Sequence, residues 1–181
     1  MRFKKANILI LTGPPGSGKS TVSQHLAEIS DSPAVHLHTD DFYNYIAKGR
    51  IEPFLPEAHK QNETVIKAIV EAACCFAEGG YFVVVDGIIG SWFLDPFREA
   101  TKSRSILLDY VILRPNLDIT LHRAKTRIKG LKDEEPIKEL HRQFQEMSTF
   151  EKYVIDSSLQ DGRETIHAIL EGMATEKFRL R

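Results

Sequence analysis

The stretch Gly13–Ser20 carries the residue types that bind the phosphates of a nucleotide. It reads Gly-Pro-Pro-Gly-Ser-Gly-Lys-Ser and matches the pattern G-x-x-x-x-G-K-[ST]. The glycines let successive backbone N–H groups point at phosphate oxygens, while Lys19 reaches the β- and γ-phosphates and the Ser20 hydroxyl is a ligand for Mg²⁺. A glycine-rich turn without function is the alternative, but this stretch lies between an apolar run and a helical pattern, as the motif requires. We therefore expect a nucleoside triphosphate to bind here, on Gly13, Pro14, Pro15, Gly16, Ser17, Gly18, Lys19, Ser20 and Thr21.

Carboxylates follow two of the apolar runs. Asp40 and Asp41 come after the second run, and Asp86 comes after the third. Transfer of a phosphoryl group to a hydroxyl needs a carboxylate that orients the hydroxyl and accepts its proton. Asp40 is the candidate base, and Asp41 is a candidate metal group or helix N-cap; the alternative is that both aspartates only cap a turn. Asp86 is expected to bind the metal through water, to hold the acceptor substrate, or to cap.

A basic segment follows the fourth apolar run. Arg123 and Arg127 are spaced i and i+4, so they share one helix face opposite the apolar stripe. Such a pair, followed by a charged loop, suits a lid that closes over phosphates. A solvated basic face is the alternative, and a nucleic-acid patch would need aromatic residues that this segment lacks.

Two histidines and two aromatic residues leave their roles open. His36 and His38 alternate along the second apolar run and therefore point to one side of a strand. They form a metal pair or, as we expect because no further ligand is evident, histidines with satisfied hydrogen bonds. Trp92 and Phe93 either wall a substrate pocket or pack, with packing favoured.

The elements that must position these residues alternate between strand and helix. Apolar strand-like runs cover 7–11, 34–39, 81–85, 107–113 and 153–155. Helical spacing between them predicts a parallel sheet with helices on both faces, which is an α/β fold of three layers. We expect one domain over 1–181, with a substrate-binding insertion at about 42–60 and a lid at about 123–136.

Length, charge and hydropathy exclude some classes of partner. The chain has 181 residues and a formal net charge of -1, so nothing in its overall charge attracts nucleic acid or an anionic membrane. No apolar run approaches the roughly 20 residues of a transmembrane helix. We expect a cytoplasmic protein, monomeric or homodimeric, whose partner is a small molecule.

The assembled motifs resemble a known group of enzymes. The resemblance rests on "GPPGSGKST", "HTDDFYNYI", "YFVVVDG" and "LRPNLDITLHRAKTR". With these the chain is similar to the small P-loop kinases of the nucleoside-monophosphate-kinase-like fold, in the branch of the chloramphenicol phosphotransferase-like, zeta-toxin-like and gluconate/shikimate-kinase-like proteins.

The resemblance implies a five-stranded parallel sheet in the order 2-3-1-4-5 and transfer of the γ-phosphoryl of ATP, with Mg²⁺, to a hydroxyl of a small molecule. It implies that Asp40 is the base and that Arg123 and Arg127 are lid arginines. It further implies an active-site arginine at Arg114 and a place for the adenine near 156–160.

Other nucleotide-binding classes are weighed against this. A GTP switch needs N-K-x-D, but no asparagine of the chain precedes a lysine, and position 89 is isoleucine where the switch-type D-x-x-G has glycine. An ATP-binding regulatory or toxin-like protein and a nucleic-acid-end kinase use the same loop. A regulatory protein would bind ATP without acceptor-dependent turnover, and the neutral net charge disfavours a polynucleotide acceptor.

Overall fold

The computed structural model describes residues 6–126 and 131–180. Its centre is a sheet of five parallel strands in the order β2-β3-β1-β4-β5, so the expected topology is confirmed. The strands are β1 (Asn7–Thr12), β2 (Ala34–His38), β3 (Phe82–Gly87), β4 (Leu107–Leu113) and β5 (Val154–Ile155). Every residue of β1 and β3 is buried, as expected for strands that helices cover on both faces.

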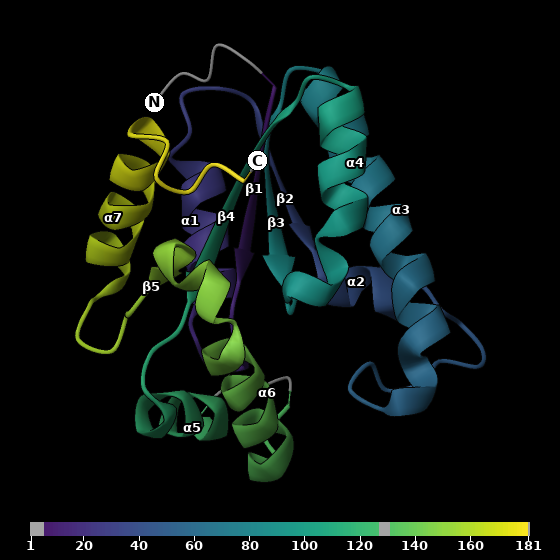
Figure 1. Cartoon of the computed structure of the whole chain (residues 1–181), viewed down its shortest axis with the longest axis vertical. Helices are drawn as coiled ribbons and strands as arrows, with labels where there is room; N and C mark the ends of the chain where they lie inside the picture. Colours follow the sequence, from purple (N-terminus) through teal and green to yellow (C-terminus); the bar gives the residue numbers. More distant parts are fainter. Residues whose placement is uncertain (1–5, 127–130, 181) are drawn as a thin grey trace.

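Helices cover both faces of this sheet. The α-helices are α1 (Lys19–Glu28), α2 (Thr39–Asn44), α3 (His59–Glu78), α4 (Asp95–Ser103), α5 (Leu117–Thr126), α6 (Glu134–Glu146) and α7 (Gly162–Ala174). Figure 1 shows α1 and α7 together on one face and α3 and α4 together on the other. Short 3-10 turns lie at Pro56–Ala58, Ser91–Phe93 and Ser148–Tyr153.

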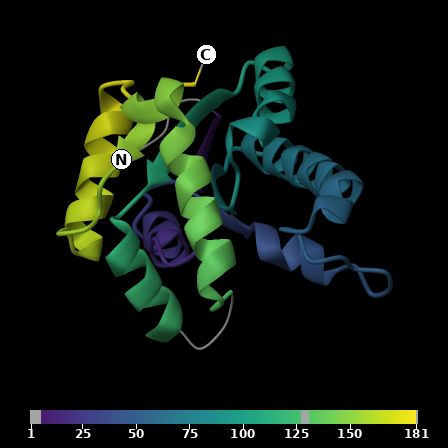
Figure 2. The same cartoon turned by 60° about the horizontal axis from the view of Figure 1, so that its bottom comes forward.

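The carboxyl ends of the strands carry the remaining helices. In Figure 1, α5 and α6 lie beyond the end of the sheet to which the strand arrows point. Figure 2 turns this end forward and shows α1 between α5 and α6, with α2 and its following loop beyond α6. Ligands of open parallel sheets bind at this end, so the fold leaves the start of α1 in the position of a binding site.

Three strands end at residues other than those predicted, and the first of them, β1, runs one residue past Leu11 to Thr12. The second strand ends at His38, because Thr39 already begins α2. The third strand was expected to end at Val85 but continues through Asp86 and Gly87, which pair with Leu11 and Thr12 of β1. Asp86 is therefore part of the sheet, and its side chain is fixed by the strand rather than carried on a loop.

A buried ion pair attaches the C-terminal segment to β4. Arg179 Nε donates to Asp109 Oδ1 at 2.9 Å, and the Asp109 side chain is fully buried. Asn7 Nδ2 donates to the other carboxylate oxygen at 3.2 Å. Backbone bonds from Tyr110 to Phe178 and from Leu180 to Leu108 extend the contact. The pair holds the end of the chain on the part of β4 that the two-residue β5 leaves uncovered.

Arg179→Ala is expected to lower the free energy of unfolding by about 3 kcal/mol, because it leaves the Asp109 carboxylate buried without its cation. Denaturant unfolding measures the change, and Lys177→Ala, on an exposed neighbour, serves as the control. Adding Asp109→Asn to Arg179→Ala should recover part of the loss. Equal stability of Arg179→Ala and Lys177→Ala would show that the pair contributes nothing.

Candidate active site

The loop between β1 and α1 has the backbone of an anion cradle. Gly16 has a φ of 87°, and a β-carbon there would lie 2.4 Å from the Thr120 carbonyl oxygen. Gly18 has a φ of 90° and is the N-cap of α1, with open space around it and no side-chain hydrogen bond to the cap. The backbone N–H groups of the first turn of α1 therefore meet no capping side chain, and the helix dipole favours an anion there.

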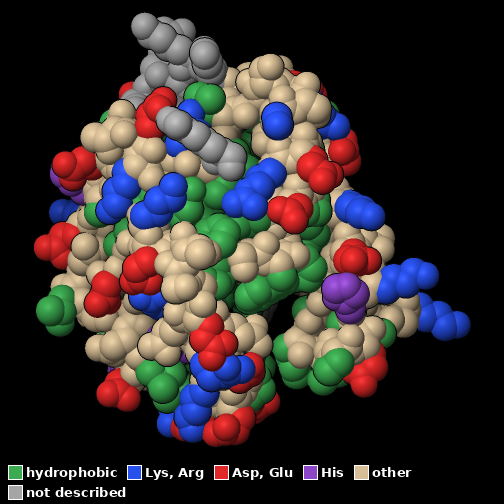
Figure 3. Space-filling view, viewed as in Figure 1, with side chains coloured by type: hydrophobic (Ala, Val, Ile, Leu, Met, Phe, Trp, Pro, Cys, Tyr) green, Lys and Arg blue, Asp and Glu red, His purple; other side chains and the backbone are tan. Residues whose placement is uncertain are grey.

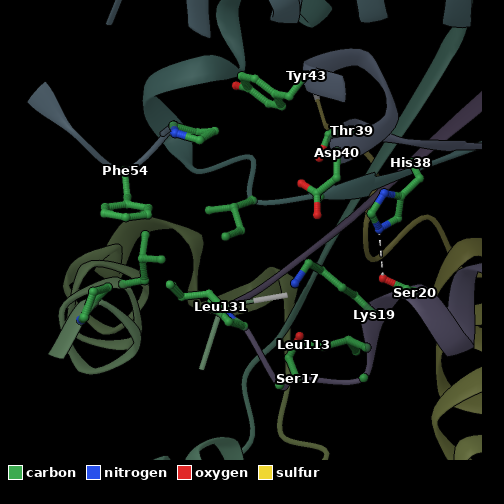
Figure 4. Close-up of a pocket in the computed structure, with 18 of the residues that line it drawn as sticks. Ser17, Lys19, Ser20, His38, Thr39, Asp40, Tyr43, Phe54, Leu113 and Leu131 are labelled. Carbon is green, nitrogen blue, oxygen red and sulfur yellow. Dashed lines mark hydrogen bonds between the residues drawn. The ribbon is translucent and has the colours of Figure 1, made fainter. Parts of the chain in front are cut away.

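Two side chains of the loop fit a polyphosphate. Ser17 Oγ is buried, and within residues 6–126 and 131–180 it has no hydrogen-bond partner. Lys19 is nearly buried, and its Nζ lies 3.4 Å from the Pro14 carbonyl oxygen, which is long for a hydrogen bond. Figure 4 shows the Lys19 amine pointing into the pocket. The loop thus combines donors, a cation and a positive φ at the helix start, which is the arrangement a triphosphate needs.

The carboxylate that the fold brings to Ser20 is Asp86. Ser20 Oγ donates to Asp86 Oδ1 at 3.3 Å and lies 3.3 Å from His38 Nε2. His36 Nε2 contacts the other oxygen, Oδ2, at 2.7 Å. His36 therefore has a hydrogen-bond partner, as expected. The sequence analysis gives Asp41 the metal role beside Ser20 and offers Asp86 as a metal group through water. The alternation of His36 and His38 along the strand was the sequence signal for the two histidines near Asp86.

Asp40 and Asp41 lie in the first turn of α2, and both side chains are exposed. Neither residue caps this helix, because its N-cap is His38 and no side chain bonds to the cap. Asp40 faces the same cavity as Lys19 (Figure 4). Burial, and then the charge of Asp40, raise the pKa of Tyr43 to about 12, so the Tyr43 hydroxyl stays protonated at neutral pH.

Gly87 sets the position of α2 by close packing. A β-carbon on Gly87 would lie 2.0 Å from Thr39 Oγ1 and 2.4 Å from Thr39 Cγ2. Gly87 ends β3 and lets the start of α2 approach the strand. The absence of a side chain at Gly87 therefore determines where Asp40 lies.

Gly87→Ala is expected to lower stability by about 1–3 kcal/mol through overpacking and to lower kcat by up to about 10²-fold, because the start of α2 must move. Adding Thr39→Ala removes the two nearest clashing atoms and should restore part of both losses. Unfolding and steady-state kinetics measure them, and Gly162→Ala, which adds a β-carbon in open space, is the control for stability. A Gly87→Ala protein with unchanged kcat would show that the approach of α2 is not needed.

The three arginines proposed for the site lie in different surroundings. Arg123 lines the cavity, and its Nη2 reaches the Ser157 carbonyl oxygen at 3.5 Å. Arg127 lies outside the described residues. Arg114 forms a two-pronged pair with Glu151, at 2.7 and 3.0 Å, and is absent from the described lining of the cavity. The resemblance implied an active-site arginine at this position, but the contacts of Arg114 hold Ser148–Tyr153 and the end of α6 together.

One large cavity joins these groups. Its volume of about 1720 Å³ exceeds the roughly 300–1,000 Å³ of a pocket for one small ligand, so a nucleotide and an acceptor fit together. The loop, Arg123 and the start of α7 line one end. The other end lies between α6 and the segment before α3, where Figure 3 shows hydrophobic side chains in a hollow. This end is lined in part by Tyr43, Phe54, Leu55, Ile66, Trp92, Phe93, Pro136 and Leu140.

Trp92 lines the cavity, although the sequence analysis favours a packing role for it. Its side chain is 47% exposed, although its ring also lies 6.1 Å from the ring of Phe144. It is the one tryptophan of the chain, so its fluorescence reports on this end of the cavity alone. Ser157 and Gln160, from the segment expected near the adenine, line the opposite end.

The described residues contain neither a membrane-spanning helix nor a ready-made metal cluster. None of the helices there is both long and apolar enough to cross a membrane. No three histidine, cysteine, aspartate or glutamate side chains in the same residues are arranged to hold a metal ion by themselves.

Comparison with known proteins supports the fold and identifies the family. A gluconokinase from Sinorhizobium meliloti superposes with a TM-score of 0.73 at 19% identity, over 97% of this chain and 95% of that one. A shikimate kinase from Acinetobacter baumannii in complex with shikimate gives 0.65 at 23%, over 96% of each chain. The tunicamycin resistance protein of Deinococcus radiodurans gives 0.68 at 14%, over 92% and 95%.

These identities are low, so the likeness shows a shared fold and no more. No curated protein sequence matches the chain significantly. The family described as "Chloramphenicol phosphotransferase-like protein" matches residues 6–174, which is nearly all of the chain. The match includes the phosphate loop, both carboxylate segments and Arg123, and the protein therefore belongs to the chloramphenicol phosphotransferase-like family.

Proposed function

We propose that this protein is an ATP-dependent phosphotransferase that moves the γ-phosphoryl group to a hydroxyl of a small molecule. The observation that carries the proposal is the shared cavity, in which the phosphate loop and Asp40 face a second compartment with apolar walls. The family of this protein and two of its structural neighbours are named for small-molecule kinases or phosphotransferases, which supports the same function.

The chain's own residues would perform the transfer as follows. Asp40 orients the acceptor hydroxyl and takes its proton as the acceptor oxygen bonds to the γ-phosphorus and the bond to the β–γ bridging oxygen breaks. Backbone amides of the loop and Lys19 stabilise the charge that develops on the phosphoryl oxygens. Arg123, with Arg127 as the second proposed lid residue, neutralises the remaining charge and excludes water.

A divalent cation would be held by Ser20 and Asp86. The fit rests on the Ser20 hydroxyl and the buried Asp86 carboxylate, which meet at the start of α1. Held there, the cation would supply positive charge that offsets the charge of the phosphates. Asp41, proposed from sequence for this role, lines the same cavity but has no contact with Ser20 among the hydrogen bonds of the described residues.

The far end of the cavity favours an acceptor with an apolar part. Phe54 and Trp92 expose large apolar surfaces there. Arg50, the one arginine that the described 45–58 segment offers, already lies 3.7 Å from Glu52 and donates to Asn44 at 3.4 Å. An acidic acceptor would meet the Glu52 carboxylate beside this cation, whereas a neutral hydroxylated molecule needs no cation there.

A phosphoryl-transfer screen tests the proposal. Purified protein with Mg-ATP is offered sugars, nucleosides, shikimate-like acids, and aminoglycoside- and phenicol-type drugs, and ADP release is measured beside Asp40→Asn. We expect acceptor-dependent release with wild type only, together with an acceptor-induced change in Trp92 fluorescence. ATP binding without turnover on any acceptor would favour the regulatory alternative, and turnover on a nucleic-acid end would favour the end-kinase alternative.

A further inference from the structure

Three donor atoms from separate elements converge beside the phosphate loop. Ser20 Oγ lies 3.3 Å from His38 Nε2 and 3.3 Å from Asp86 Oδ1, and His38 Nε2 lies 3.5 Å from the same Asp86 oxygen. Ser20 is in the first turn of α1, His38 ends β2 and Asp86 lies near the end of β3. Figure 4 shows the contact between Ser20 and His38. The atoms form a nearly equilateral triangle whose members are a hydroxyl, an imidazole and a carboxylate.

The triangle is close to one face of an octahedral metal site. Neighbouring ligands of an octahedral ion with bonds of about 2.1 Å lie about 3.0 Å apart, because the edge of an octahedron is √2 times its radius. The observed edges of 3.3, 3.3 and 3.5 Å need each donor to move inward by only a few tenths of an ångström. The opposite face stays available for phosphate oxygens and water.

The two carboxylate oxygens of Asp86 differ in the lengths of their contacts. Its side chain is fully buried. Oδ2 has a short contact of 2.7 Å with His36 Nε2, whereas the contacts of Oδ1 with Ser20 and His38 are long, at 3.3 and 3.5 Å. Hydrogen bonds from a hydroxyl to a carboxylate are usually near 2.7 Å, so these two are weak. A buried carboxylate oxygen with weak partners is unfavourable, and a cation at the centre of the triangle would satisfy it.

We propose that His38 is a direct ligand of the cation that accompanies the nucleotide, together with Ser20 and Asp86, and that the site therefore prefers a first-row transition ion such as Mn²⁺ or Co²⁺ to Mg²⁺. Imidazole nitrogen is a ligand for ions of the first transition series, with an affinity that rises from Mn²⁺ to Co²⁺, and it is a poor ligand for Mg²⁺, which prefers oxygen. His36 fixes the carboxylate through Oδ2 and so turns Oδ1 toward the site.

The inference rests on the proposed function in one respect, because nucleotide phosphates must supply further ligands. The described part of the chain has no three histidine, cysteine or acidic side chains that hold a metal unaided. We therefore expect weak binding of Mn²⁺ to the protein alone and much tighter binding in the presence of the nucleotide.

Pulsed EPR on the full-length protein tests the ligand directly. Mn²⁺ is added with AMP-PCP, an ATP analogue that is not turned over and has no bridging nitrogen. A nitrogen coupling to Mn²⁺ is expected, and it should change from the ¹⁴N to the ¹⁵N pattern when the protein is made with ¹⁵N-histidine. This comparison needs no mutation, so it does not depend on the folding of a variant.

Matched histidine variants assign the coupling to a residue. His38→Asn should abolish the coupling and raise the Kd for Mn²⁺ in the ternary complex by at least about 10-fold, with a smaller rise for Mg²⁺. His36→Asn should weaken Mn²⁺ binding but keep the coupling. His25→Asn, on an exposed part of α1, should change neither quantity.

The outcomes separate this inference from the proposed function. Tight binding of Mn²⁺ and AMP-PCP without any histidine coupling would overturn the role of His38 and leave the kinase proposal intact. Coupling that is lost in His36→Asn and kept in His38→Asn would overturn it as well. Histidine coupling in a protein that passes no phosphoryl group to any acceptor would support the metal site and count against the kinase. If AMP-PCP does not bind to the protein in the presence of either Mn²⁺ or Mg²⁺, both proposals fail.

Discussion

Lys19→Ala is expected to lower kcat by about 10³-fold or more, which is the effect of removing one preorganised group that stabilises transition-state charge. Lys19 is the lysine of the phosphate loop, its amine points into the cavity, and its exposed fraction is 9%. Water replaces the amine poorly in such a place, because a cation in a partly buried site acts through a lower dielectric than in bulk water.

The fold should survive this change. The contact of Lys19 Nζ with the Pro14 carbonyl oxygen is long, at 3.4 Å, and α1 keeps its backbone bonds. Unfolding of Lys19→Ala should thus follow wild type within about 1 kcal/mol. Lys67→Ala, on an exposed position of α3, is the control for kcat. Near-normal turnover of Lys19→Ala would remove the loop lysine from the mechanism.

Asp40→Asn is expected to lower kcat by about 10²–10⁴-fold while the Kd for ATP stays within about twofold of wild type. The asparagine keeps the shape of the side chain but cannot accept the proton of the acceptor hydroxyl. Asp40 is exposed in the first turn of α2 and caps nothing, so stability should hardly change. Steady-state kinetics and calorimetric ATP titration measure the two quantities.

Asp41→Asn is the matched control for this prediction. Asp41 is adjacent, equally exposed and in the same turn of α2, so general effects of charge should appear in both variants. A large loss of kcat confined to Asp41→Asn would transfer the role of base to that residue. Joint loss of ATP binding and turnover in Asp40→Asn would instead indicate a carboxylate that shapes the site.

Much of the fold could be predicted from local sequence because its signals are local. The glycines and lysine of the loop, the apolar run before them and the helical spacing after them lie within about twenty residues of one another. The strand at 107–113 was placed at its observed bounds, since seven largely apolar residues buried on both faces are hard to mistake. Apolar spacing in a helix does not by itself ensure burial, because Phe76 continues the spacing of Val65 and Ile69, and Ile29 that of Val22 and Leu26, but both are exposed.

The same distinction between local and long-range signals applies to the candidate site. A phosphate loop, and carboxylates after the second and third apolar runs, can be predicted from the sequence alone. Which carboxylate meets Ser20 cannot, because Asp41 and Asp86 both follow apolar runs and the choice depends on which strand lies beside α1 and how far that strand extends. Nor does the sequence show that Arg114 pairs with Glu151, 37 positions away in the chain.

The contacts that join distant segments depend on how the strands and helices pack. Asp86 meets Ser20, His36 and His38 because β3 lies between β1 and β2 and runs two residues further than its apolar run. Asp40 lies where it does because Gly87 leaves room for Thr39. The residues of the phosphate loop are consecutive in the chain, because neighbouring backbone groups bind the phosphates. The cation site and the base are assembled across the sheet, where strand order and the packing of one glycine set the distances.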